Sequence, residues 1–125
     1  MRYMTFVKHP ADYDVSKVPQ SLFAAMGEFV EEQIRNGMFI DGAGLQPLSK
    51  ATRVRLSGGK ITVSDGPFSE AKEVVGGYSL IEAKTHAEAV ELTRKFMELH
   101  RVHWPEFEGE AELRPLEKMG DPAHP

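Results

Sequence analysis

Two stretches of the chain repeat apolar residues at the spacing of an amphipathic helix. In residues 19–36 the apolar positions recur every three or four residues, between Pro19, which suits a first helical turn, and the helix-ending pair Asn36-Gly37. The second stretch follows Thr85-His86-Ala87-Glu88, which has the form of a capping box. Its apolar stripe consists of Ala89, Leu92, Phe96 and Leu99. The spacing predicts two helices that each bury one face.

Shorter stretches alternate apolar and polar residues, which is the period of a half-buried strand. Residues 3–9 are the first, and Pro10 ends it because proline has no N–H to donate. Residues 74–83 and 110–116 alternate in the same way. Residues 38–40 predict one more short strand, which we expect to stop before the glycine-containing stretch 41–44.

The clearest local signal is a β-hairpin. Residues 52–57 and 60–64 flank Gly58-Gly59, and a two-residue hairpin turn needs the positive φ angles that glycine adopts freely. Counting outward from the turn predicts the pairs Leu56 with Ile61, Val54 with Val63, Arg55 with Thr62, and Arg53 with Ser64. We expect the aliphatic pairs to face the core and the two arginines to lie on the other face.

The order of these elements is strand, helix, two hairpin strands, strand, helix, strand. Two helices on one face of an antiparallel sheet are the economical packing of that order, so we predict an α+β, ferredoxin-like fold with a split βαβ arrangement. The helices cover one sheet face only, yet both faces of the strands carry apolar residues. A homodimer is therefore expected to cover the open face. We predict one domain at residues 1–118 and a loose tail at 119–125.

Composition removes several functions from consideration. The chain has no cysteine, so it has no disulfide, no thiolate nucleophile and no sulfur-ligated zinc. It contains no apolar run near the roughly 20 residues that cross a bilayer, and a cytoplasmic protein without a membrane partner is expected. A formal net charge of -4 argues against nucleic acid as a partner. Nothing in the sequence predicts a cofactor.

Residues 65–73 carry three carboxylates and a lysine immediately after a strand. One interpretation is a polar pocket in which Asp65 is an acid, base or ligand anchor, while Arg53 and Arg55 hold an anionic ligand. The other is structural, because Asp65-Gly66-Pro67 is typical turn chemistry and Phe68 would plug the core. Local chemistry alone leaves both interpretations open.

The segment Asp65-Gly66-Pro67-Phe68-Ser69-Glu70-Ala71-Lys72-Glu73, followed by Gly76-Gly77-Tyr78, resembles the signature of the YCII-related, or DGPF-domain, family. The resemblance extends to residues 42–47, 53–60 and 112–115, where members of that family carry similar residues. The resemblance implies a ferredoxin-like fold of the dimeric α/β-barrel type, paired through the open sheet face. Some relatives are associated with extracytoplasmic-function sigma factors. A catalytic histidine near the first helix has been suspected in smaller YciI-like relatives, but Ser21 stands at that position here.

Three histidines are candidates for chemistry. His9 closes the first strand and would substitute as a proton-transfer group if it met Asp65, although a histidine before proline is also a common surface strand end. His100 and His103 share a helix face, as a metal site requires. Histidines at a helix C-terminus also interact favourably with the helix dipole, and no third ligand is evident, so no metal is predicted.

Two functions follow from these patterns. The first is a small-molecule pocket, with an anionic ligand and acid-base enzymatic chemistry as its finer form. The alternative is a non-catalytic regulatory module that binds a transcription factor. For the pocket, we predict catalytic roles for Asp65 and His9 and ligand contacts from Arg53, Arg55, Pro67, Phe68, Lys72 and Tyr78.

Overall fold

The structure is a computed structural model that describes residues 1–117, so the predicted tail at 119–125 and the predicted domain end at residue 118 lie outside the described residues. Its strands and α-helices are β1 (Arg2–Pro10), α1 (Gln20–Arg35), β2 (Phe39–Gly44), β3 (Thr52–Ser57), β4 (Lys60–Asp65), β5 (Glu73–Glu82), α2 (His86–His103) and β6 (Glu110–Pro115). Short 3-10 turns lie at Val15–Lys17 and Leu48–Lys50. No helix within residues 1–117 is both long and apolar enough to cross a membrane.

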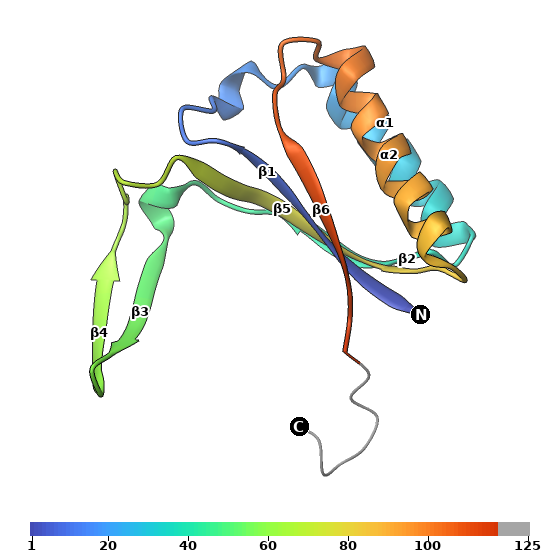
Figure 1. Ribbon diagram of the computed structural model, residues 1–125. Helices are drawn as coiled ribbons and strands as arrows, with labels where there is room; N and C mark the ends of the chain where they lie inside the picture. The colour runs from blue at the N-terminus through green and yellow to red at the C-terminus, as the bar shows by residue number, and fades with distance from the viewer. Residues whose placement is uncertain (118–125) are drawn as a thin grey trace.

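Four of the strands form one antiparallel sheet in the order β2-β5-β1-β6. Helices α1 and α2 pack against each other and lie on the same face of this sheet (Figure 1). This order and one-sided cover define a ferredoxin-like α+β fold, so the predicted fold class is confirmed. The β3-β4 hairpin is inserted between the second and third strands of that arrangement and forms its own two-stranded sheet.

The core lies at one end of the interface between sheet and helices. Tyr3 and Ile81 are cross-strand partners on the sheet, and both are almost fully buried. Ala89 and Leu92 of α2 pack on them, as the predicted apolar stripe requires. Phe29, Met38 and Leu113 complete the cluster from its margin. Further along the same face of β1, the side chains become smaller or polar, and the packing opens.

The predicted start of the second helix is confirmed. The Thr85 hydroxyl accepts a hydrogen bond from the backbone N–H of Glu88 at 3.1 Å, which satisfies one donor of the first turn. The Glu88 carboxylate reaches back and accepts from the N–H of Lys84 at 3.2 Å. This is a capping box whose return bond falls one residue before the cap.

The prediction that the strand after α1 stops at residue 40 is wrong. Strand β2 continues through the glycine-containing stretch to Gly44 and pairs with β5. A side chain at Gly42 would meet the carbonyl oxygen of Tyr78 at 2.8 Å, so glycine is what lets the strands approach here. The local sequence does not favour a strand here, and the backbone hydrogen bonds to β5 hold the stretch in one.

The hairpin has the predicted register but not the predicted core face. All four expected pairs are present, from Leu56 with Ile61 to Arg53 with Ser64, and both turn glycines have positive φ. The aliphatic face is open, because its residues are 67–71% exposed: Val54, Leu56, Ile61 and Val63. The hairpin projects away from the four-stranded sheet (Figure 1), so no helix or strand of residues 1–117 covers that face.

Candidate functional site

A cavity of about 670 Å³ lies between the helices and the sheet, beyond the core. It exists because the sheet presents small residues to the helices at this end. Gly42, Gly44, Gly77 and Ala111 all line the cavity, and none of them fills the gap left by the helix side chains. Gly76, the neighbour of Gly77 in the glycine pair, lines the cavity as well.

The sheet side of the cavity carries a pair of hydroxyl groups. Thr5 of β1 and Ser79 of β5 are directly paired, and their side-chain oxygens share a hydrogen bond. Only one hydroxyl donates in such a bond, so the accepting partner keeps a proton of its own to offer. Thr5 is 7% exposed, which places this polar pair within an otherwise apolar wall.

Two further polar side chains reach the cavity from the helices. Gln33 of α1 and His100 of α2 are each 7% exposed, and both belong to the lining. Thr93 also lines it, but its hydroxyl donates to the backbone carbonyl of Ala89 at 2.9 Å and is thereby occupied. The helices thus contribute an amide and an imidazole as their polar groups.

The His100 ring has a fixed orientation. Its Nδ1 lies 3.1 Å from the carbonyl oxygen of Phe96, and the rings of Phe96 and Phe107 lie 5.1 and 4.9 Å from it, centroid to centroid. A carbonyl oxygen can only accept, so Nδ1 carries the proton in the neutral ring. Burial lowers the pKa of His100 below its usual value, and the bond to Phe96 opposes that change only in part.

His9 lines the same cavity and also a shallower pocket. Its Nδ1 bonds the carbonyl of Pro10 at 2.8 Å, and its ring stacks on Tyr13 at a centroid distance of 3.9 Å. The ring packs over Gly76, where an added Cβ would come within 2.8 Å of Nε2. Tyr13 in turn contacts Trp104 edge-on, and burial raises the pKa of the Tyr13 hydroxyl. An aromatic wall therefore runs from His9 to His100.

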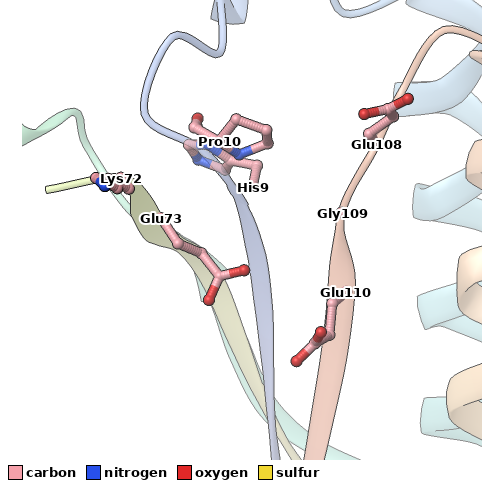
Figure 2. A pocket seen from close by; sticks show the side chains of 7 residues that line it. All are labelled: His9, Pro10, Lys72, Glu73, Glu108, Gly109 and Glu110. Atoms are coloured by element: carbon pink, nitrogen blue, oxygen red, sulfur yellow. Dashed lines mark hydrogen bonds between the residues drawn. The ribbon is translucent and has the colours of Figure 1, made fainter.

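Figure 2 shows the shallower pocket, of about 260 Å³, at the ends of β1, β5 and β6. Its walls include Lys72 and three carboxylates, those of Glu73, Glu108 and Glu110. The Glu73 and Glu110 side chains extend toward β1 from either side, whereas Glu108 lies apart from them. Residues 1–117 contain no group of three or more His, Asp or Glu side chains arranged to hold a metal ion.

The signature turn makes contacts mainly with the hairpin. Asp65 accepts from the Thr52 hydroxyl at 2.9 Å. The guanidinium of Arg53 lies 3.7 Å from the centre of the Phe68 ring and pairs with the Glu70 carboxylate. These contacts tie the base of the hairpin to the segment that leads into β5.

The expected convergence of Asp65 with the two arginines is not found. Asp65 pairs with Thr52, whereas Arg53 pairs with Ser64, one position along. Side chains alternate between faces of a strand, so Asp65 and the arginines lie on opposite faces of the hairpin. Arg53 instead meets the Glu70 carboxylate. A hydrogen bond from the backbone N–H of Glu70, followed by the hydrogen bond from Arg53, lowers the pKa of this carboxylate.

The structure separates the predicted site residues into two groups. His9 lines the large cavity, and His9 and Lys72 line the shallow pocket. Tyr78 also borders the large cavity, but its side chain lies with its partner Phe6 on the opposite face of the sheet. Neither space is lined by the remaining members, which are Arg53, Arg55, Asp65, Pro67 and Phe68. Their contacts with a ligand stay predictions, as does the catalytic role of Asp65 and His9.

Sequence reasoning missed Thr5, Gln33 and Ser79, and it considered His100 only as half of a metal site. A signal was available, because His100 continues the stripe of Leu92 and Phe96 at a spacing of four residues. Thr5 likewise lies between Tyr3 and Val7 on the buried face of β1. Polar residues at positions that the period assigns to the core point to a cavity or a buried hydrogen bond.

A sequence profile of the YCII-related domain matches residues 1–98. The chain belongs to the YCII-related family. A family relative is a protein of Rhizobium meliloti (strain 1021), named only as uncharacterized, which is 32% identical over 100 residues. That alignment covers 80% of this chain and 73% of the relative. The family thus agrees with the resemblance of the 65–73 segment and carries no named activity with it.

Substitution of Gly66 tests whether the signature turn is a structural joint. A Cβ at this position would overlap the carbonyl oxygen of Leu48, which is backbone and cannot swing away. Gly66→Ala should therefore lower the free energy of unfolding by about 1–3 kcal/mol. Gly27→Ala is the matched control, because Gly27 is exposed in α1 with no atom near its Cβ position. Gly27→Ala should raise the free energy of unfolding by about 1 kcal/mol. Urea unfolding measures both changes. Equal effects of the two changes would contradict this account.

The lowered pKa of His100 predicts a pH dependence of stability. Above about pH 6.5 the ring is neutral in both folded and unfolded chains. As the pH falls, the unfolded chain takes up a proton that the buried ring resists, so stability is lost down to the folded pKa. Urea unfolding between pH 7.5 and 5 should show a shallower loss in His100→Phe than in the unaltered protein. Identical slopes would show that His100 is not resisting protonation.

Proposed function

We propose that the protein binds a small, neutral and mainly apolar organic molecule in the cavity between the helices and the sheet. The observation that carries this proposal is the character of the walls. Among residues 1–117, no Asp, Glu, Lys or Arg lines the cavity, and its polar side-chain groups are hydroxyls, amides, imidazoles and the indole N–H of Trp104. A concave apolar site of several hundred Å³ with a few placed polar groups is typical of small-molecule sites.

An anionic ligand at the 65–68 turn is the finer prediction from sequence, and the contacts of that turn support it less. Arg53 is already engaged by Glu70 and by the face of Phe68, and Asp65 accepts from Thr52. A ligand there would have to displace these partners before it gained any contact of its own. A ligand in the cavity would not have to displace any of these contacts.

The chain provides its own reporter of binding, because Trp104 is the single tryptophan and it lines the cavity. Titration with naphthalene-sized neutral compounds should change Trp104 fluorescence in a saturable way. Gly44→Leu should weaken binding about tenfold or more, since the nearest atom to its new Cβ is 3.9 Å away and the side chain has room to enter the cavity mouth.

Gly27→Leu adds the same side chain at an exposed helix position outside the cavity and should leave the affinity unchanged. Saturable binding that Gly44→Leu does not affect would locate the ligand elsewhere. No fluorescence change and no binding heat with any neutral aromatic probe would refute the proposed function.

A second proposal concerns assembly, and it rests on the aliphatic face of the hairpin. Four side chains at 67–71% exposure on one projecting hairpin are an exposed apolar patch. The sheet face away from the helices adds half-buried Met4, Phe6 and Leu80. We propose that a second copy of the chain covers both surfaces, in agreement with the dimer expected from sequence. Binding to a transcription factor and a cytoplasmic location remain predictions.

The double variant Leu56→Glu with Ile61→Lys tests this assembly. These residues are direct cross-strand partners, so the new charges pair with each other and preserve the hairpin while they remove its apolar face. Light scattering after size exclusion should give twice the chain mass for the unaltered protein and one chain mass for the variant. Arg55→Gln on the opposite face should remain dimeric. A monomeric unaltered protein at micromolar concentration would refute the dimer.

A further inference from the structure

We infer that the molecule bound in the cavity is an aromatic compound that bears a hydroxyl group, and that this hydroxyl donates a hydrogen bond to Nε2 of His100. The inference rests on the proposed function and specifies the class of ligand. It follows from the protonation pattern of one buried ring and from the walls around it.

The hydrogen bond to Phe96 decides what His100 offers to a ligand. Since Nδ1 donates to the Phe96 carbonyl, the neutral ring has its proton on that atom and a lone pair on Nε2. Nε2 is therefore an acceptor. Burial favours the neutral form, which keeps it an acceptor at neutral pH.

The position of Nε2 makes it accessible to a guest. Within residues 1–117, the His100 ring makes one hydrogen bond, and it is made by Nδ1. In the same part of the chain, every side-chain nitrogen or oxygen that is fully buried has a hydrogen-bond partner. Nε2 makes no such bond and is therefore not fully buried, and since His100 lines the cavity we infer that Nε2 faces it.

The surrounding side chains favour an aromatic ring. Phe96 and Phe107 flank His100, and Phe29 lies 6.0 Å from Phe96 across the two helices. Trp104 and Phe107 continue the aromatic wall, with their ring centroids 5.3 Å apart. Ring pairs at such distances gain edge-to-face or offset contacts beyond simple burial. A flat aromatic guest fits these walls.

The same acceptor discriminates against other ligands. A hydrocarbon without a donor would bury Nε2 unpaired, and the cost of an unsatisfied buried acceptor reduces its affinity. A carboxylate would place negative charge against a lone pair, in a cavity that no Lys or Arg of residues 1–117 lines. A hydroxyl donates to the acceptor and satisfies it without bringing a charge into the cavity.

The experiment compares three probes that share one ring system: 2-naphthol, 2-methoxynaphthalene and 2-naphthoate. Affinities are measured at pH 7.5 by isothermal titration and by Trp104 fluorescence. The unaltered protein should bind 2-naphthol about fivefold to tenfold more tightly than the methyl ether, which is the effect of about one hydrogen bond. It should bind 2-naphthoate more weakly than either.

Two variants assign the preference to one ring. His100→Phe keeps a planar ring without the acceptor, so it should bind 2-naphthol and the ether equally. His103→Phe is the matched control, because His103 is on the same helix and does not line the cavity, and it should retain the preference. In the unaltered protein, the ¹⁵N resonance of His100 Nε2 should shift with 2-naphthol and not with the ether, which tests the contact even if His100→Phe does not fold.

The outcomes separate the inference from the proposed function. Equal binding of 2-naphthol and the ether by the unaltered protein overturns the hydroxyl inference while cavity binding stands. Tighter binding of 2-naphthoate, or a preference that survives in His100→Phe, also overturns it. If none of the probes binds, the proposed function fails and the inference fails with it.

Discussion

The pairing of β5 with β1 on one side and β2 on the other decides where the functional surfaces of this protein lie. With both neighbours in register, Ile81, Ser79 and Gly77 follow one another on the face that meets the helices. Their side chains become smaller in that order, from the buried Ile81 to the hydroxyl of Ser79 to Gly77, which has no side chain. The interface between sheet and helices is consequently packed at one end and hollow at the other.

The cavity at the hollow end has a mainly apolar lining that includes a few polar groups. Aromatic rings from α1, α2 and the segment before β6 form its walls, and the hydroxyl pair, the Gln33 amide and the His100 ring are its principal polar groups. In such surroundings each polar group has a large effect on which guest is accepted, because an unmatched partner is not compensated by water. The backbone carbonyls that hold the Nδ1 atoms of His9 and His100 are therefore part of the site, although no ligand would touch them.

The signature turn at residues 65–68 joins the hairpin to the rest of the fold and does not line the cavity. Arg53, Phe68 and Glu70 join the hairpin to the segment before β5, and Gly66 approaches the Leu48 carbonyl too closely for any other residue. A turn held in this way sets the direction in which the hairpin projects. Its most recognisable residues are thus explained by backbone contact and by one stacked cation, and the aliphatic face of the hairpin is left exposed as a consequence.

Local sequence determined the elements themselves, because helix periodicity, the Thr85 cap and the Gly58-Gly59 turn depend on residues close in the chain. The ferredoxin-like order followed, since few arrangements bury two amphipathic helices on one antiparallel sheet. Only the tertiary structure decided that residues 41–44 extend β2, because those hydrogen bonds come from β5, more than thirty residues away in the chain. It alone decided which hairpin face is open and that Thr5, Ser79, Gln33 and His100 meet in one cavity. Alternation assigns a side chain to a face, but what lies opposite that face depends on packing between distant segments, which no local pattern encodes.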